Sequence, residues 1–306
     1  MWYLNLNFYT KTLEEGMAFV LLALGVYITF RILDFADLTV EGSFPLGAAV
    51  VARFIVSGVN PVLATIVAFM AGCIAGMITG IINTKLKIAG LLAGILTMTS
   101  LYSINLRIMG KSQISLFRKA KIFDGFEKLF GSDYGILFSL IIIVLIIKIL
   151  LDYFLHTEIG MSIRATGDNP VMIETLGVNT DLIKISGLAI ANGMVALSGA
   201  LYAQYSSSAD VQMGMGMIVV GLASVIIGEV FVRTSKIPLA TLGVIIGAVL
   251  YRFAIAVSLR LGFDATDLKI VTAILVILAL GAPSIRKFLI QDEFAERLLE
   301  EVDEDA

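Results

Sequence analysis

Uninterrupted apolar runs constrain the fold of this chain more than any other feature of its sequence. A helix needs about 20 consecutive apolar residues to cross a bilayer, and there it must bond its backbone polar groups internally. The predicted spans cover residues 16–33, 43–58, 61–83, 88–108, 134–155, 184–205, 214–232, 238–260 and 265–282. The sequence therefore predicts an all-α polytopic membrane protein with about nine transmembrane helices, and with eight or ten as alternatives because two spans contain breaks.

The composition supports this fold class and a single membrane domain. Hydrophobic residues make up 58% of the chain and charged residues 15%, whereas soluble domains carry about 25% charged residues. The 28 glycines suit helices that pack closely in lipid. We expect one transmembrane domain over residues 1–290, followed by an acidic tail over 291–306 whose eight acids and one base are solvated.

Two segments rich in small residues form a weak internal repeat. Residues 71–80 precede a Gly-interrupted span at 90–99, and residues 191–200 precede a Gly-rich, Met-rich stretch at 213–217. Interrupted helices paired in this way are typical of transporters built from repeats. The alternative is that small residues recur in any helix bundle, and the compositional similarity leaves both open.

The segment after the first span combines acids with a helix start. Asp34, Asp37 and Glu41 lie at the edge of or within an apolar region, where a carboxylate is costly and commonly functional. Pro45 predicts a helix that begins at residue 42 or 43, so that 34–42 would be irregular backbone lining a cavity. The N–H groups of such a helix end suit an anionic group, such as a carboxylate. The alternative is a solvated loop. The candidate path residues here are Thr39, Glu41, Gly42 and Ser43.

Two further groups of residues are candidates for the same path. Thr97 and Thr99 lie inside the fourth span, and Met213 and Met215 lie in the Gly-rich entry to the seventh. Hydroxyls form hydrogen bonds without charge, and methionine offers an adaptable apolar surface. Ordinary helix packing is the alternative for each of the four.

A polar, turn-rich segment at 157–182 separates two long spans. Asn169 followed by Pro170 is typical of a capped helix start, Glu174 follows within about a turn, and Gly177 is a natural stop. The segment therefore predicts a short capped helix on the membrane surface. Another protein can bind such a helix and displace it.

Searches for catalytic and cofactor motifs find none. Gly110-Lys111-Ser112 resembles the end of a phosphate-binding loop, but Asn105 stands where the first glycine belongs. His156 is the only histidine and Cys73 the only cysteine, so no multi-ligand metal site of these residues is predicted. We expect neither enzymatic activity nor a resident cofactor, and nucleic acid is not an expected partner.

Basic residues near the span ends give divided evidence on orientation. A cytoplasmic 157–182 segment places one basic set inside, namely Arg31, Lys85, Lys87, Arg164, Arg233, Lys236, Arg286 and Lys287. It places a second set outside, against the positive-inside rule, namely Lys111, Arg118, Lys119, Lys121 and Lys128.

With these residues placed, the chain resembles the membrane permeases of ATP-binding-cassette importers in the branched-chain amino acid and ribose permease superfamily. Residues 37–43 (Asp-Leu-Thr-Val-Glu-Gly-Ser) are similar to that group's Asp-Leu-Ser-Val-Gly-type segment, and residues 160–179 to its cytoplasmic coupling loop. The order of spans also matches over nearly the whole chain. Residues 33–48 most resemble the putative tryptophan/tyrosine uptake subgroup, and Glu41 departs from the ribose-type pattern.

The resemblance implies a homodimer or pseudo-dimer, two cytoplasmic ATPase subunits that bind ATP and Mg, and an extracytoplasmic solute-binding lipoprotein. It also fixes 157–182 as cytoplasmic, with the basic segment 109–133 outside, where the binding protein or anionic lipid is expected. The coupling helix that docks into the ATPase would contain Ala165, Thr166, Gly167, Asp168, Asn169, Pro170, Glu174, Leu176 and Gly177.

We therefore expect a permease subunit in the plasma (cytoplasmic) membrane for ATP-driven uptake of an amino acid, either aromatic or branched-chain. One alternative is the same machinery carrying a sugar or a nucleoside. The other is a secondary transporter that uses the acids at 34, 37 and 41 for ion coupling.

Overall fold

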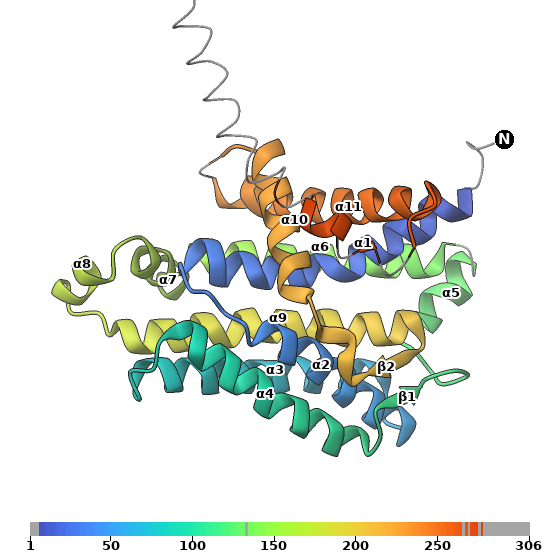
Figure 1. Ribbon diagram of the computed structural model, residues 1–306, viewed down its shortest axis with the longest axis horizontal. Coiled ribbons are helices and arrows are strands. Elements are labelled where there is room, and N and C mark those ends of the chain that lie inside the picture. Colours follow the sequence, from blue (N-terminus) through green and yellow to red (C-terminus); the bar gives the residue numbers. More distant parts are fainter. Residues whose placement is uncertain are drawn as a thin grey trace, which may run out of the picture.

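Long apolar helices make up most of the part of the chain that the structure describes, and most of them lie roughly parallel or antiparallel to one another (Figure 1). The computed structural model describes residues 6–131, 134–234, 236–264, 267–268, 270–274 and 277. Seven helices in this part are long and apolar enough to cross a membrane. An eighth helix overlaps the predicted span 43–58 but has only 17 residues. The ninth predicted span lies largely outside the described residues, as do Arg286, Lys287 and the acidic tail.

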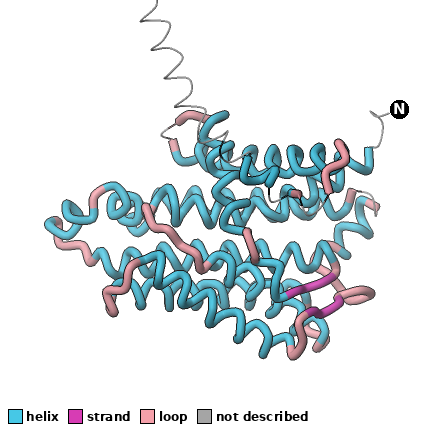
Figure 2. The backbone as a smooth tube through the Cα atoms, viewed as in Figure 1, coloured by secondary structure: helices cyan, strands magenta, loops and turns pink. Residues whose placement is uncertain are grey.

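The helices follow the predicted spans closely. The long ones are α1 (Leu6–Val26), α2 (Val40–Val56), α3 (Pro61–Thr84), α4 (Gly90–Met109), α6 (Gly135–His156), α9 (Thr180–Ser206), α10 (Met217–Phe231) and α11 (Ile237–Arg260). The short elements are the π-helix η1 (Tyr27–Ile32), β1 (Gln113–Ser115), α5 (Asp124–Phe130), α7 (Glu158–Asp168), α8 (Pro170–Thr175), β2 (Ser208–Asp210) and the 3₁₀ turn η2 (Val211–Gly214). The two strands pair antiparallel at one end of the bundle (Figure 2).

Local sequence accounts for several helix ends. The Asn60 side chain accepts a hydrogen bond from the Val62 N–H at 2.8 Å, and Pro61 occupies the first position of α3. Such a residue pair satisfies one unpaired N–H group and omits another. At the C-terminal end of α4, the C-cap residue Gly110 takes a φ of +70°, which a glycine adopts without strain.

Glycines bring α3 and α9 into direct backbone contact. A Cβ on Gly72 would lie 3.0 Å from the Cα of Gly193, and one on Gly76 would lie 2.9 Å from the Cα of Ala189. The partner residue number falls as the α3 number rises, so the two helices are antiparallel. Thus the two small-residue segments of the sequence pack against each other. Their origin as a repeat remains a prediction.

Helix α2 joins the same glycine-rich core. A Cβ on Gly47 would lie 2.7 Å from the Cα of Ala196, and one on Gly199 would lie 3.2 Å from the Cα of Phe44. Where lipid surrounds a bundle, small residues of this kind let helices approach closely and gain van der Waals contact. The helices α2, α3 and α9 are therefore tightly packed against one another through their backbones.

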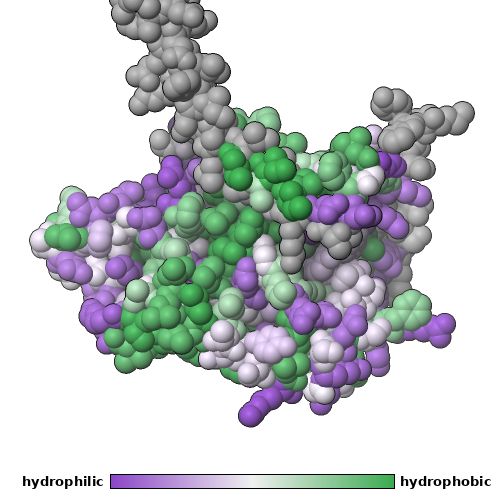
Figure 3. All heavy atoms as spheres, in the orientation of Figure 1, coloured by the Kyte–Doolittle hydropathy of each residue, from purple (hydrophilic) through white to green (hydrophobic). Residues whose placement is uncertain are grey.

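The two ends of the bundle carry different elements. The short helices α7 and α8 lie at one end together with the end of η1, and the paired strands β1 and β2, α5 and the start of α1 lie at the other (Figure 1). Arg31 pairs with Glu229 at 2.7 Å, and Lys85 with Asp181 at 3.1 Å, both at the α7–α8 end. Between the ends, hydrophobic side chains cover much of the visible surface (Figure 3), as expected for a lipid-facing belt.

The segment 109–133 folds back onto the end of α9. Its apolar residues Ile114, Leu116 and Phe123 are buried. The Ile122 N–H donates to the Gln204 Oε1 at 2.9 Å, and the Lys121 Nζ donates to the Ser207 Oγ at 2.6 Å. The described residues of this segment thus form a short strand, turns and one short helix.

Candidate functional site

Helix α2 begins earlier than Pro45 predicts. Its first residue is Val40, with Thr39 as N-cap, so the predicted start at residue 42 or 43 is wrong. The Asp37 carboxylate accepts from the Thr39 N–H at 2.9 Å and starts the helix where the proline pattern gave no signal. Pro45 lies one turn inside and cannot donate to the Glu41 carbonyl. Residues 33–39 are irregular, so the irregular backbone predicted over 34–42 is confirmed for 34–39 and wrong for 40–42, which belong to α2.

A buried polar network holds the irregular segment to the core. Asn192 of α9 donates to Asp37 Oδ2 at 2.6 Å, and Ser43 Oγ donates to Asn192 Oδ1 at 2.7 Å. The hydroxyls of Thr39 and Thr79 are 2.8 Å apart. All five side chains are buried. Because buried polar groups are costly unless bonded, the network fixes the position of α2 against α3 and α9.

The start of α2 meets the start of α10. Glu41 Oε1 accepts from the Gly216 N–H at 3.0 Å, and Gly216 is the N-cap residue of α10 with a φ of +83°. A Cβ on Gly214 would lie 3.0 Å from the carbonyl carbon of Glu41, so the two segments touch. The Glu41 carboxylate therefore lies at the positive end of α10.

This geometry corrects the predicted anion site at the start of α2. The Thr39 N–H is bonded to Asp37, while the Gly42 and Ser43 N–H groups donate to the Thr39 carbonyl at 2.9 and 2.8 Å. These three donors are occupied inside the protein and are not available to a solute carboxylate.

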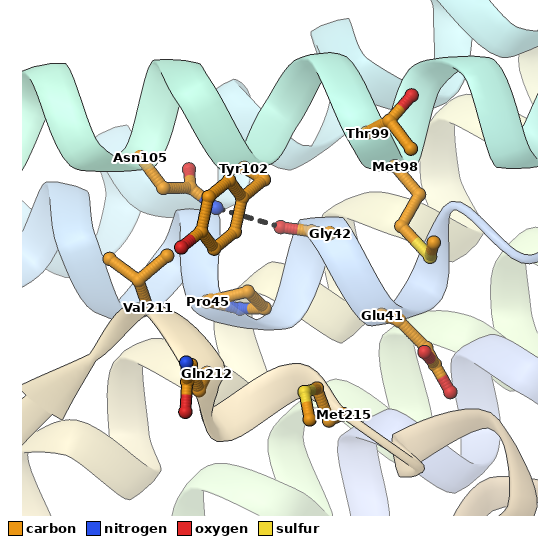
Figure 4. A pocket seen from close by; sticks show the side chains of 10 residues that line it. All are labelled: Glu41, Gly42, Pro45, Met98, Thr99, Tyr102, Asn105, Val211, Gln212 and Met215. Carbon is orange, nitrogen blue, oxygen red and sulfur yellow. Dashed lines mark hydrogen bonds between the residues drawn. The ribbon is translucent and has the colours of Figure 1, made fainter. Parts of the chain in front are cut away.

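A cavity of 290 Å³ lies between α2, α4 and the segment that enters α10. Figure 4 shows Glu41, Gly42 and Pro45 on α2, with the α4 side chains on one side and Gln212 and Met215 on the other. The lining residues are Glu41, Gly42, Pro45, Met98, Thr99, Tyr102, Asn105, Val211, Gln212 and Met215. Several of them are exposed at the protein surface, so the cavity opens outward from this chain.

Four of the eight predicted path residues line this cavity: Glu41, Gly42, Thr99 and Met215. The other four lie outside it. Thr39 and Ser43 belong to the buried network, the Thr97 hydroxyl donates to the Ala93 carbonyl of its own helix at 3.0 Å, and Met213 packs against the hydrophobic core.

Sequence reasoning missed three polar lining residues, Tyr102, Asn105 and Gln212. Met98, Tyr102 and Asn105 follow one another at the spacing of one helix face, which is the available signal for the first two. Asn105 donates from Nδ2 to the Gly42 carbonyl at 3.2 Å and thereby links α4 to α2. Gln212 lies in an irregular approach to α10, where no periodicity marks it.

The polar loop contains two helices rather than one. The predicted coupling helix over 165–176 is wrong as a single element, because the backbone breaks at Asn169 between α7 and α8. The predicted cap and stop are confirmed. Asn169 Oδ1 accepts from the Met172 N–H at 3.0 Å, Pro170 opens α8, and Gly177 follows with a φ of +83°. Ala165, Thr166, Gly167 and Asp168 form the last turn of α7, and Leu176 is the C-cap of α8.

The two short helices differ in how they contact the bundle. In α7, Ile163 is fully buried, and a Cβ on Gly167 would overlap the Ile32 carbonyl oxygen at the end of η1. In α8, by contrast, Val171, Met172 and Leu176 are 69%, 58% and 67% exposed. Glu174 accepts a hydrogen bond from Thr180 at 2.6 Å and ties α8 to the start of α9. The loop therefore exposes the apolar surface of α8, while α7 anchors the loop to η1.

Comparison with known proteins identifies the family. A family model described as the permease component of branched-chain amino acid transport systems matches residues 8–280. The chain belongs to this family. It is accordingly a multi-pass integral protein of the plasma membrane and a transport subunit. This family match, together with the tyrosine permease described next, confirms the resemblance to permeases of the aromatic amino acid subgroup.

Three relatives of this permease have names that state what they transport. It is 45% identical to the tyrosine transport system permease protein of Clostridioides difficile (strain R20291) over 87% of this chain and 88% of that protein. It is 27% identical to the autoinducer 2 import system permease protein LsrC of Yersinia pseudotuberculosis (serotype O:3, strain YPIII), over 82% of this chain and 68% of that protein. It is 25% identical to the ribose import permease protein RbsC of Escherichia coli (strain K12), over 86% and 78%. No solved structure matches the chain.

Proposed function

We propose that this permease forms the translocation path of an ATP-binding-cassette importer for an aromatic amino acid, with tyrosine as the leading solute. The observation that carries the proposal is the 45% identity to a tyrosine transport permease over 87% of the chain. The relatives named for ribose and autoinducer 2 are less similar, at 25% and 27%. This difference favours an amino acid over a sugar.

The cavity supports a solute of this kind. Its 290 Å³ lies just below the range of about 300–1,000 Å³ for ligand pockets. Glu41 provides a carboxylate that suits the ammonium group of an amino acid. Pro45, Met98 and Met215 provide apolar contact for a side chain, and Tyr102 provides an aromatic face for a ring.

The α7–α8 end supports docking of separate ATPase subunits. Val171, Met172 and Leu176 offer an apolar patch on a capped helix that projects from the bundle (Figure 1). Behind this patch, α7 rests on η1, and η1 leads through residues 33–39 to the start of α2 and to Glu41. Displacement of α7 by an ATPase would therefore act on the cavity wall through a short, packed path.

A second permease copy and a solute-binding lipoprotein complete the proposed importer. The cavity opens on the surface of this chain, and a second copy facing it would enclose a path between the subunits. The paired strands β1 and β2 and the described residues 109–131 of the basic segment lie at the end opposite α7–α8, which suits a delivery protein on the other side of the membrane (Figure 1).

Reconstitution of the permease with its ATPase and solute-binding protein tests the proposal. We expect ATP inside proteoliposomes to drive uptake of labelled tyrosine, with ribose failing to compete. Uptake that persists without the ATPase and collapses with an ionophore would instead establish the ion-coupled alternative.

A charge placed on the proposed docking patch tests its role separately. Met172→Glu should abolish co-purification of the ATPase subunits, because it places a carboxylate on the apolar surface of α8. Phe117→Glu is the matched control, since Phe117 is 71% exposed in the turn after β1 at the other end. Equal retention of the ATPase by both variants would refute docking at α8.

A further inference from the structure

One wall of the cavity holds a buried hydrogen-bond acceptor that the described part of the protein leaves unpaired. Asn105 is 0% exposed, and its Oδ1 has no hydrogen-bond partner among the described residues. Two other buried polar atoms in this part of the chain share that property, Thr166 Oγ1 and Arg252 Nε. Of the three residues, only Asn105 lines the cavity. An unpaired buried acceptor is destabilising, so its retention calls for a functional reason.

The orientation of the Asn105 amide is fixed by its other end. Nδ2 donates to the Gly42 carbonyl at 3.2 Å, and a carbonyl can accept only from the NH₂ side of the amide. A flip of the amide would set two acceptors against each other. The unpaired end of the side chain is therefore an acceptor, and not a donor, and it lies buried in the wall of the cavity.

The order of groups along the cavity matches the order of groups in tyrosine. Figure 4 shows Glu41 and Asn105 at opposite ends of the lining set, with Pro45 and Met215 between them. A carboxylate, an apolar middle and a neutral acceptor correspond to the ammonium group, the ring and the phenolic O–H. Tyr102 lies one turn before Asn105 and is half-exposed, so its ring can turn aside to admit a solute.

We propose that Asn105 Oδ1 accepts a hydrogen bond from the phenolic hydroxyl of the solute, which makes Asn105 a specificity-determining residue for tyrosine over phenylalanine. The inference rests on the proposed function and names the substrate within its class. Sites that hydrogen-bond a hydroxyl reject analogues lacking it, because the buried partner is then left unpaired. For a single bond to a neutral acceptor, we expect a preference of about tenfold.

The test measures the ratio of tyrosine to phenylalanine uptake by the complete importer, corrected for the affinity of the solute-binding protein for each. Asn105→Leu should lower this ratio about tenfold, because it removes the acceptor. Gln204→Leu is the matched control. It removes a buried amide of α9 that donates to Thr65 at 2.9 Å and lies outside the cavity. It should reduce uptake of both solutes equally.

Wild-type protein provides a second measurement that does not depend on variants folding. Phenylalanine analogues with 4-fluoro or 4-methoxy groups lack the O–H donor and should compete with tyrosine uptake about tenfold less well than 4-amino-phenylalanine, which has a donor. Equal competition, or an unchanged ratio in Asn105→Leu, overturns the role of Asn105. Absence of tyrosine uptake by the wild type instead overturns the proposed function, so the two failures are distinct.

Discussion

The contact between α7 and η1 makes a strong prediction for Gly167→Ala. The added Cβ would overlap the Ile32 carbonyl oxygen and lie 2.8 Å from its carbon and 3.1 Å from the Leu33 Cα. Ordinary contact begins near 3.4 Å, and every atom in the way belongs to the backbone, so no side chain can rotate to make room. Overpacking of this kind costs about 1–3 kcal/mol. The melting temperature should therefore fall by about 2–12 °C, since 1 kcal/mol shifts a large domain by about 2–4 °C.

The same substitution should also impair transport more than stability alone explains. Because α7 must move away from η1, ATP hydrolysis by the assembled importer should continue while tyrosine uptake per ATP falls. The assay compares uptake with phosphate release in proteoliposomes below the melting temperature of the variant. Gly125→Ala is the control, since a Cβ there meets nothing within 4 Å. An unchanged melting temperature and an unchanged uptake-to-ATP ratio in Gly167→Ala would refute the proposed path.

Two buried polar groups give further predictions. Lys148 pairs with Asp152 at 2.6 Å, and the two side chains are only 15% and 13% exposed. Lys148→Met should therefore destabilise the protein by about 3 kcal/mol, and adding Asp152→Asn should restore most of the lost stability. Thermal unfolding in detergent measures both variants, and a double variant no more stable than the single one would contradict the ion-pair argument. Asn192→Leu should cost about 1–3 kcal/mol, because among the described residues it leaves the Asp37 carboxylate with hydrogen bonds from Thr39 alone. A melting curve equal to that of the wild type would contradict this.

The spans were predictable because lipid imposes one rule on every residue in them. Eight predicted spans coincide with eight helices to within a few residues at most ends, since the apolar length of a helix is set by the bilayer rather than by its neighbours. The cap at Asn169 and the stop at Gly177 were predictable for a similar reason, because each depends on a few consecutive residues.

The cavity was only partly predictable because its walls come from distant segments. The sequence singled out Glu41 as an acid in an apolar region, but its partner Gly216 is 175 residues away. Asn105 stands in a span with no local irregularity, and its role follows from the Gly42 carbonyl 63 residues earlier. Thr39 and Ser43 looked like path residues because they are polar, yet their partners Thr79 and Asn192 place them in the interior.

The glycine contacts among α2, α3 and α9 also limit how this permease can change shape. An interface made of side chains can slip by one turn and repack, but backbones that touch have no rotamers to exchange. These three helices must therefore behave as one strut through a transport cycle. The approach to α10 and α4 also meet α2 at glycines, because a Cβ on Gly214 would lie 3.0 Å from the Glu41 carbonyl carbon and one on Gly42 would lie 3.1 Å from the Met98 Cα. Alternating access in this permease would then move the whole set of helices against a second copy, rather than one wall of the cavity against the other.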